Sequence, residues 1–210
     1  MRLPRGWMLA ITGMALATAV RAAAPALDPS DMVRGSPTAP ITIVEYASVG
    51  CPHCGALHRD IFPAFKAKYI DTGQVRWVSR ELLTGDQSLA AGGFLLARCA
   101  GKDHYFDVTD AIYRDQAKIE DDLHDGLLAV AKSVGMTEDQ FTACLRDKAN
   151  LDALDARTEL GQADHIRATP TLLINGKQVA DGEVTLADLD KIVAAARKKN
   201  APAASKKKKK

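Results

Sequence analysis

The sequence lacks the ligand pairs that a structural zinc site needs. Only four cysteines occur among its 210 residues, and only Cys51 and Cys54 lie close together in the chain. Structural zinc is usually held by two such close pairs of cysteine or histidine. His53 lies between the two cysteines, but the other four histidines form no second pair at ligand spacing. The sequence therefore predicts no metal centre.

The sequence also has little excess of either positive or negative charge. The formal net charge is +2, with three arginines in residues 1–22 and five lysines at residues 206–210. The chain between these ends therefore carries a net charge of about −6. No surface for nucleic acid is predicted. Residues 201–210 combine small residues with like charges and are expected to form a disordered, lysine-rich tail.

Long apolar runs are missing beyond the first 22 residues. Residues 7–20 are apolar, follow Arg2 and Arg5, and precede small residues. This is the pattern of a signal peptide cleaved after Ala22. An uncleaved anchor is the alternative, but a membrane-spanning helix takes about 20 apolar residues. We therefore expect residues 1–22 to direct export to a compartment that permits disulfides.

The rest of the chain has the pattern of an α/β protein. Residues 23–40 are rich in Ala, Pro, Asp and Ser and are predicted to form an extended lead-in. Apolar and β-branched runs predict strands, and Asn175-Gly176 predicts a two-residue hairpin turn. The predicted strands are residues 41–49, 74–82, 171–174 and 177–180.

Helical patterns occupy the remaining intervals. One begins at Cys51 and contains Pro63, which is expected to kink or break it. Thr185 is expected to cap a last helix. Another block is helical throughout and includes a capping box at residues 137–140. The predicted units are a mixed-sheet core at residues 41–85 and 151–200 and an inserted helical domain at residues 86–150.

The stretch VGCPHCGALH carries the predicted chemistry. Cys51 lies where a strand gives way to a helix, so unpaired backbone N–H groups and the helix dipole favour its thiolate. Cys51 is therefore predicted to be the exposed nucleophile, and Cys54, one turn into the helix, the resolving thiol. His53 would add a hydrogen bond or positive charge at the Cys51 sulfur. A stabilised thiolate, with Pro52 and His53 between the cysteines, favours donation of the disulfide to a substrate.

The two distant cysteines suit a structural role instead. A static Cys51–Cys54 disulfide would close too small a ring to stabilise the fold much. Cys99 and Cys144 lie on apolar faces of predicted helices. Closing a loop on the order of 45 residues contributes about 4 kcal/mol in the chain-entropy model. We therefore predict a Cys99–Cys144 disulfide, with two buried free thiols as the alternative.

Several motifs together resemble the thioredoxin superfamily. They are APITIVEYASVGCPHC, the cysteine-bearing helical insertion, ATPTLLINGK and the closing helix. Within the superfamily they resemble a DsbA-type periplasmic thiol–disulfide oxidoreductase over nearly all of residues 31–198. The resemblance implies a thioredoxin-like mixed sheet with an inserted helical domain, and a location in the periplasm.

The resemblance also implies roles for three further residues. Pro170 would be a cis-proline beside the active site, and Thr169 would present its backbone to an extended substrate segment. A trans peptide bond between them is the alternative. Glu45 would be a buried acid that helps Cys54 lose its proton, and a salt bridge to a lysine is the alternative. The remaining histidines are assigned to the surface or to helix caps: His58, His104, His124 and His165.

The leading functional hypothesis is an exported oxidase that donates the Cys51–Cys54 disulfide to cysteine pairs of unfolded secreted proteins. No cofactor is expected beyond this disulfide. A DsbB-like quinone-linked membrane oxidase would reoxidise it, and a monomer is expected.

Two other hypotheses remain. The first is an isomerase or reductant of the same fold, but such isomerases carry an N-terminal dimerisation domain, and only about 18 residues precede the first strand here. The second is a copper-binding or chaperone-like module that would hold Cu(I) through Cys51, His53 and Cys54.

Overall fold

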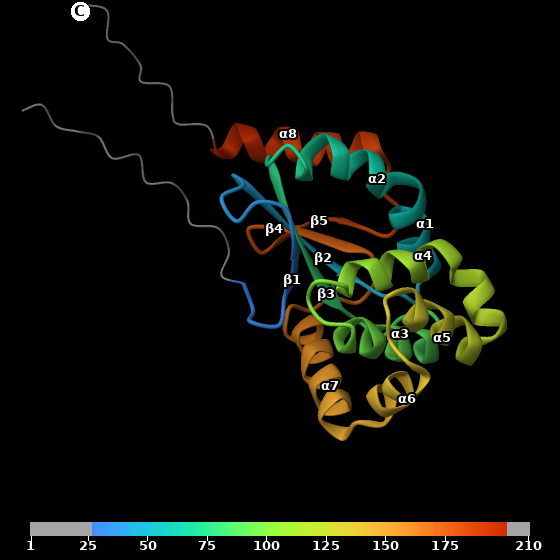
Figure 1. Ribbon diagram of the computed structural model, residues 1–210. Helices are drawn as coiled ribbons and strands as arrows, with labels where there is room; N and C mark the ends of the chain where they lie inside the picture. Colours follow the sequence, from blue (N-terminus) through green and yellow to red (C-terminus); the bar gives the residue numbers. More distant parts are fainter. Residues whose placement is uncertain (1–26, 201–210) are drawn as a thin grey trace, which may run out of the picture.

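A computed structural model describes residues 27–200 as a five-stranded mixed sheet surrounded by helices (Figure 1). β2 and β3 run parallel, and the other neighbouring strands run antiparallel. The predicted mixed sheet is therefore confirmed. The predicted signal peptide and lysine-rich tail lie outside the described residues. The order across the sheet is β1 (Met32–Arg34), β3 (Val75–Glu81), β2 (Ile41–Ala47), β4 (Thr171–Ile174) and β5 (Lys177–Asp181).

The central position of strand β2 agrees with its apolar and β-branched composition. All seven of its residues are buried, because it pairs with β3 on one side and β4 on the other. Successive side chains of a strand point to opposite faces. Ile41 and Ile43 therefore share one core cluster, whereas Val44 and Tyr46 belong to another. Glu45 follows the same alternation and lies on the face of Ile41 and Ile43.

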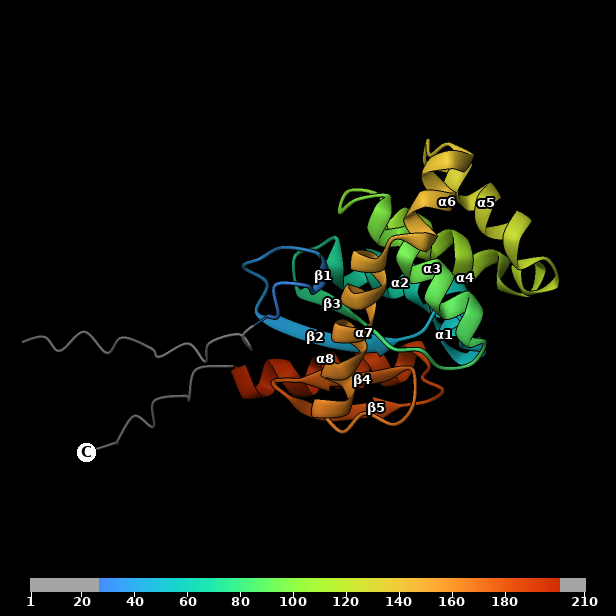
Figure 2. The same cartoon turned by 90° about the horizontal axis from the view of Figure 1, so that it is seen from below.

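Helices cover both faces of the sheet (Figures 1 and 2). α8 (Leu186–Asn200) packs on the face of Ile43, where Leu189 and Val193 join the same core cluster. α7 (Lys148–Ala163) lies on the opposite face. The hydroxyl of Tyr46 reaches α7 and donates a hydrogen bond to Asp164, the residue that follows it. The sheet is thus the middle layer of three.

The helical run after Cys51 has an irregular pattern. α1 (Pro52–Ala56) passes into a π-helical segment (Leu57–Ile61), then α2 (Phe62–Phe65), then a second π-helical segment (Lys66–Ile70). Pro63 lies in the first turn of α2, where a missing N–H donor is tolerated. The helix is therefore not broken at Pro63: the chain stays helical, and its helical pattern changes.

The segment between β3 and β4 contains five helices and no strand among the described residues. The last of them, α7, crosses the predicted boundary at residue 150 and packs both on β3 and on the other helices of this segment. Only Leu154 and Gly161 of α7 are buried, so the apolar period that marks a helix is weak in this stretch. The insertion comprises α3 (Gln87–Cys99), α4 (Tyr105–Asp121), α5 (Leu123–Ser133), α6 (Glu138–Arg146) and α7.

Short-range sequence signals agree with the structure. The capping box that opens α6 is present, and Asn175 and Gly176 have φ angles of 53° and 71°, as the hairpin turn requires. The Thr185 hydroxyl accepts a hydrogen bond from the N–H of Asp188 at the start of α8. β1 was missed because three residues in an extended lead-in carry no pattern of their own. Within residues 27–200, no helix has both the length and the apolar character to cross a membrane.

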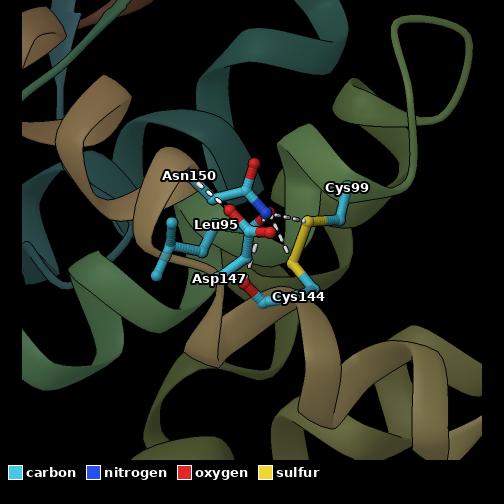
Figure 3. Close-up of a disulfide and its surroundings, with 5 residues drawn as sticks. All are labelled: Leu95, Cys99, Cys144, Asp147 and Asn150. Carbon is cyan, nitrogen blue, oxygen red and sulfur yellow. Dashed lines mark hydrogen bonds between the residues drawn. A yellow bond between two sulfur atoms is a disulfide. The ribbon is translucent and has the colours of Figure 1, made fainter.

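Cys99 and Cys144 form a disulfide with an S–S distance of 2.04 Å, which confirms the predicted pair (Figure 3). Asp147 caps α7 by accepting a hydrogen bond from the Asn150 N–H. The Asn150 side chain in turn donates to the Cys99 sulfur at 3.3 Å and to the Cys144 carbonyl. The disulfide therefore ties the end of α3 to the junction of α6 and α7.

Replacing both Cys99 and Cys144 with alanine is expected to lower the free energy of unfolding by up to about 4 kcal/mol. The reason is that the disulfide spans 45 positions and restrains a long loop in the unfolded chain. Urea unfolding measures the difference, with the Cys51–Cys54 pair oxidised in both proteins. A loss below about 1 kcal/mol would mean that closing this loop adds little stability.

Candidate active site

Cys51 lies at the N-cap of α1, and Pro52 occupies the first helical turn. The Cys51 sulfur is 3.3 Å from the carbonyl oxygen of Thr169. The pKa of Cys51 is lowered to about 5, chiefly by a hydrogen bond with the Cys54 thiol, and further by Thr169 and the backbone N–H groups of Cys54 and His53. Burial opposes this shift. A pKa near 5 favours the thiolate of Cys51 at neutral pH. The residue is only 6% exposed and is thus less accessible than the exposed position that the sequence predicts.

Cys54 has the opposite environment. It is 0% exposed, and its sulfur accepts a hydrogen bond from the N–H of Ser48 at 3.5 Å. Burial raises its pKa well above the ordinary value, and the hydrogen bond with Cys51 and the charge of Glu45 raise it further. Both cysteines are free thiols in this structure. The pair is therefore divided into an acidic thiol near the surface and a protonated thiol beneath it.

This division predicts the pH dependence of alkylation. The rate at which iodoacetamide modifies Cys51 should rise through a midpoint near pH 5 and stay constant up to pH 8, because only the thiolate reacts. Mass spectrometry of the modified peptide measures the rate. In a Cys54→Ala variant the midpoint should move upward, because the largest cause of the lowered pKa is removed. A wild-type midpoint near 9 would contradict the proposed environment.

The side chain of His53 lies away from the reactive sulfur. Its Nδ1 is 3.3 Å from Oε1 of Glu183, and both side chains are more than half exposed. His53 acts on Cys51 through its backbone N–H. The predicted hydrogen bond from the imidazole to the Cys51 sulfur is therefore replaced by a main-chain contact, because α1 directs this side chain toward solvent.

The Thr169–Pro170 peptide bond is cis, in agreement with the prediction. Both residues are buried beside Cys51. The Thr169 hydroxyl shares a hydrogen bond with the hydroxyl of Thr84, and the backbone carbonyl of Thr84 accepts one from Ser48. Thr84 and Ser48 thus hold the loop that carries the cis bond against the end of β2.

Glu45 is fully buried, and none of its partners within residues 27–200 is a lysine. Nε2 of His58 lies 2.9 Å from Oε1 and 3.0 Å from Oε2, and Nε1 of Trp77 donates to Oε2 at 3.0 Å. The alternative of a lysine salt bridge was therefore wrong. The assignment of His58 to the surface was also wrong, since its side chain is 7% exposed. A histidine four positions beyond Cys54 on an irregular helix gives no sequence signal for such a contact.

Two other residues, Gln116 and Thr84, shape the site without a sequence signal. The side-chain amide of Gln116, on α4, donates to the carbonyl of Val49 at 2.8 Å, just before Cys51. Thr84 contacts Thr169 across 85 positions of the chain. Neither contact was expected, because the two partners of each lie far apart in the chain and meet only in the folded structure. In residues 27–200, no three His, Cys, Asp or Glu side chains are grouped as metal ligands would be.

Comparison with known proteins agrees with this geometry. The family model described as thioredoxin matches residues 27–195. A Rickettsia bellii protein, provisionally named a protein-disulfide oxidoreductase, is 35% identical over 156 residues, or 72% of this chain. The crystal structure of Wolbachia pipientis alpha-DsbA1 superposes with a TM-score of 0.74 at 27% identity, covering 83% of this chain and 94% of that one. This chain is a DsbA-type member of the thioredoxin superfamily.

Other DsbA-like proteins extend the comparison. Disulfide bond formation protein D of Bacillus subtilis is 28% identical, and the match covers 76% of this chain and 72% of that protein. The oxidised BdbD structure from the same organism has a TM-score of 0.62 at 21% identity, covering 80% of this chain and 93% of that one, and shows a shared fold. The present chain spans about three-fifths of the length of the Rickettsia bellii protein.

Proposed function

We propose that this protein is an exported thiol–disulfide oxidase that donates the Cys51–Cys54 disulfide to cysteine pairs of unfolded proteins in the periplasm. The opposed pKa shifts of the two thiols carry the proposal, with Cys51 near 5 and Cys54 well above its ordinary value. A thiolate stabilised by the fold makes the dithiol form favourable, and this makes the disulfide a strong oxidant. The signal-peptide pattern at residues 1–22 and the names of the relatives support export and disulfide chemistry.

The reaction would proceed by two thiol–disulfide exchanges. A substrate thiolate attacks the Cys51 sulfur, the Cys51–Cys54 bond breaks, and Cys54 leaves and takes up a proton. A mixed disulfide now joins the substrate to Cys51. A second substrate thiolate then attacks the first substrate sulfur, and Cys51 leaves as a thiolate. The substrate has lost two electrons, and the pair has gained them.

The surroundings of Cys51 fit this sequence of steps. Its low pKa makes it the better leaving group, because thiols of low pKa leave faster. The cis bond before Pro170 brings the Thr169 backbone next to the sulfur, where an extended substrate segment would lie. A quinone-linked membrane oxidase would return the pair to the disulfide.

The equilibrium of the Cys51–Cys54 pair with glutathione tests the proposal. A reduction potential near the value of strong donors, about −120 mV, is expected. A value near −270 mV would make the protein a reductant and would direct the search to an electron donor. A pair that does not exchange with glutathione would overturn the proposal. Cys99 and Cys144 must be followed separately by peptide mapping, so that their disulfide is not counted.

A further inference from the structure

A buried acid and a buried histidine form a pair beneath the active-site helix. Glu45 is 0% exposed and the His58 side chain 7%. Nε2 of His58 faces both oxygens of the Glu45 carboxylate. The ring is stacked on Tyr113 at a centroid distance of 4.2 Å and an angle of 8°, and it also contacts Phe62 at 4.8 Å. These contacts hold the imidazole in one orientation.

The second nitrogen of His58 has no hydrogen-bond partner among the residues that the structure describes. Nδ1 is buried, and no protein group within residues 27–200 binds it. A buried polar atom without a partner is costly, and such atoms usually bind an internal water. His58 lines a small cavity of about 10 Å³, together with Ser79, Tyr105 and Thr109. This volume is on the order of what one water needs.

The charged groups around the ring come from several elements. Glu45 on β2 is the only carboxylate among the described residues that contacts it directly. Other titratable or charged groups on neighbouring elements are partnered or uncharged at neutral pH. The uncharged groups are Cys54 on α1 and Tyr105 and Tyr113 on α4. The charged groups are two arginines that have their own carboxylate partners. Arg80 of β3 pairs with Asp31, and Arg34 of β1 pairs with Asp110 and lies over the Phe62 ring.

We propose that His58 exchanges a proton with a cavity water at Nδ1 whenever Glu45 exchanges one with Cys54, so that the buried pair stays electrically neutral. The inference rests on the proposed function, because it concerns the protonation of Cys54 during disulfide exchange. A lone buried charge is far more costly than a paired one. The neutral combinations are a carboxylate with an imidazolium and a carboxylic acid with an imidazole.

The step balances in atoms and charge. When the dithiol is oxidised, Cys54 gives its proton to Glu45, and its sulfur attacks Cys51 in a mixed disulfide. The Cys51–Cys54 bond forms, and the partner sulfur leaves as a thiolate with the electron pair of the broken bond. His58, initially an imidazolium, releases its Nδ1 proton to the cavity water and keeps the Nε2 proton that it donates to Glu45. Reduction of the disulfide runs the same steps in reverse.

Nitrogen NMR of the full mature chain with ¹⁵N-labelled histidine tests this proposal directly. In the dithiol form, prepared with dithiothreitol, both His58 nitrogens should carry protons. In the disulfide form, prepared with oxidised glutathione, only Nε2 should carry one. A His58→Gln variant assigns the resonances by their disappearance. The same protonation state in both forms would overturn the proposal, whereas a pair that cannot be oxidised at all would overturn the proposed function instead.

A kinetic test separates proton exchange from a purely structural role. Glutamine at position 58 can still donate an N–H toward Glu45, but it cannot release a proton. In His58→Gln, the rate at which Cys54 displaces glutathione from Cys51 should fall by about 10-fold or more. The midpoint of Cys51 alkylation should stay near pH 5. An unchanged displacement rate, or an equal disturbance of alkylation, would contradict the proposal. His104→Gln, at an exposed position, is the control and should change neither.

Discussion

Replacing Cys51 with serine is expected to reduce disulfide donation to the uncatalysed background. In the proposed mechanism a substrate thiolate attacks the Cys51 sulfur first, and the low pKa of Cys51 makes it the leaving group of the second exchange. A hydroxyl cannot form the mixed disulfide, so both steps are lost. The measurement is the rate of oxidation of a reduced, unfolded protein with several cysteines, followed by the loss of free thiols.

Cys54→Ser is the matched control for this variant. Cys51 remains in this variant, so its thiolate can still attack a small-molecule disulfide. The serine at position 54 cannot then displace the small molecule from Cys51. A mixed disulfide with Cys51 should accumulate and be visible by mass spectrometry. Full oxidase activity in Cys51→Ser would rule out the mechanism proposed for this pair.

Replacing Glu81 with glutamine is expected to lower the free energy of unfolding by about 3–5 kcal/mol, the usual effect of breaking a buried ion pair. Glu81 ends β3, and its side chain is 0% exposed. Nε of Arg98 lies 2.5 Å from one carboxylate oxygen, and Nε of Arg157 lies 2.6 Å from the other. The hydroxyl of Tyr105 also donates to it. Without the carboxylate charge, two largely buried guanidinium groups lose their counter-ion.

The same carboxylate explains how the insertion is attached to the sheet. Arg98, Tyr105 and Arg157 come from α3, α4 and α7, and all three meet one side chain of β3. Urea unfolding measures the effect of the Glu81→Gln change. Asp152→Asn is a matched control, since the Lys148–Asp152 pair is exposed and should contribute only about 0.3–0.5 kcal/mol. A loss as small as the control's would mean that the insertion is held by apolar packing alone.

Much of the active site was accessible from the sequence because its signals are local. The Cys51-Pro52-His53-Cys54 segment at a strand-to-helix junction places one thiol at a helix N-terminus, and this needs no knowledge of distant residues. The turn at Asn175-Gly176 also depends only on neighbouring residues. The Cys99–Cys144 disulfide was predicted because both cysteines lie on apolar helix faces.

The sequence could not indicate the contacts between segments that lie far apart in the chain. His58 was assigned to the surface or to a helix cap because no local pattern gave it a role, and the packing of α4 against the helix after Cys51 buries it. His53 was expected at the Cys51 sulfur, but the direction of the helix turns its ring toward Glu183. The bounds of α7 carry little sequence signal, because few of its residues are buried.

The sequence by itself therefore determined four of the five strands of the sheet, the position of the reactive thiol and the family of the fold. These depend on short-range patterns of hydrophobicity, backbone preference and helix termini. Only the tertiary structure decided the partners of the two buried acids, His58 and Trp77 for Glu45 and two arginines for Glu81. The physical reason is that a buried charge must find its counter-charge wherever the packing places one, and the packing brings together residues that no local pattern connects.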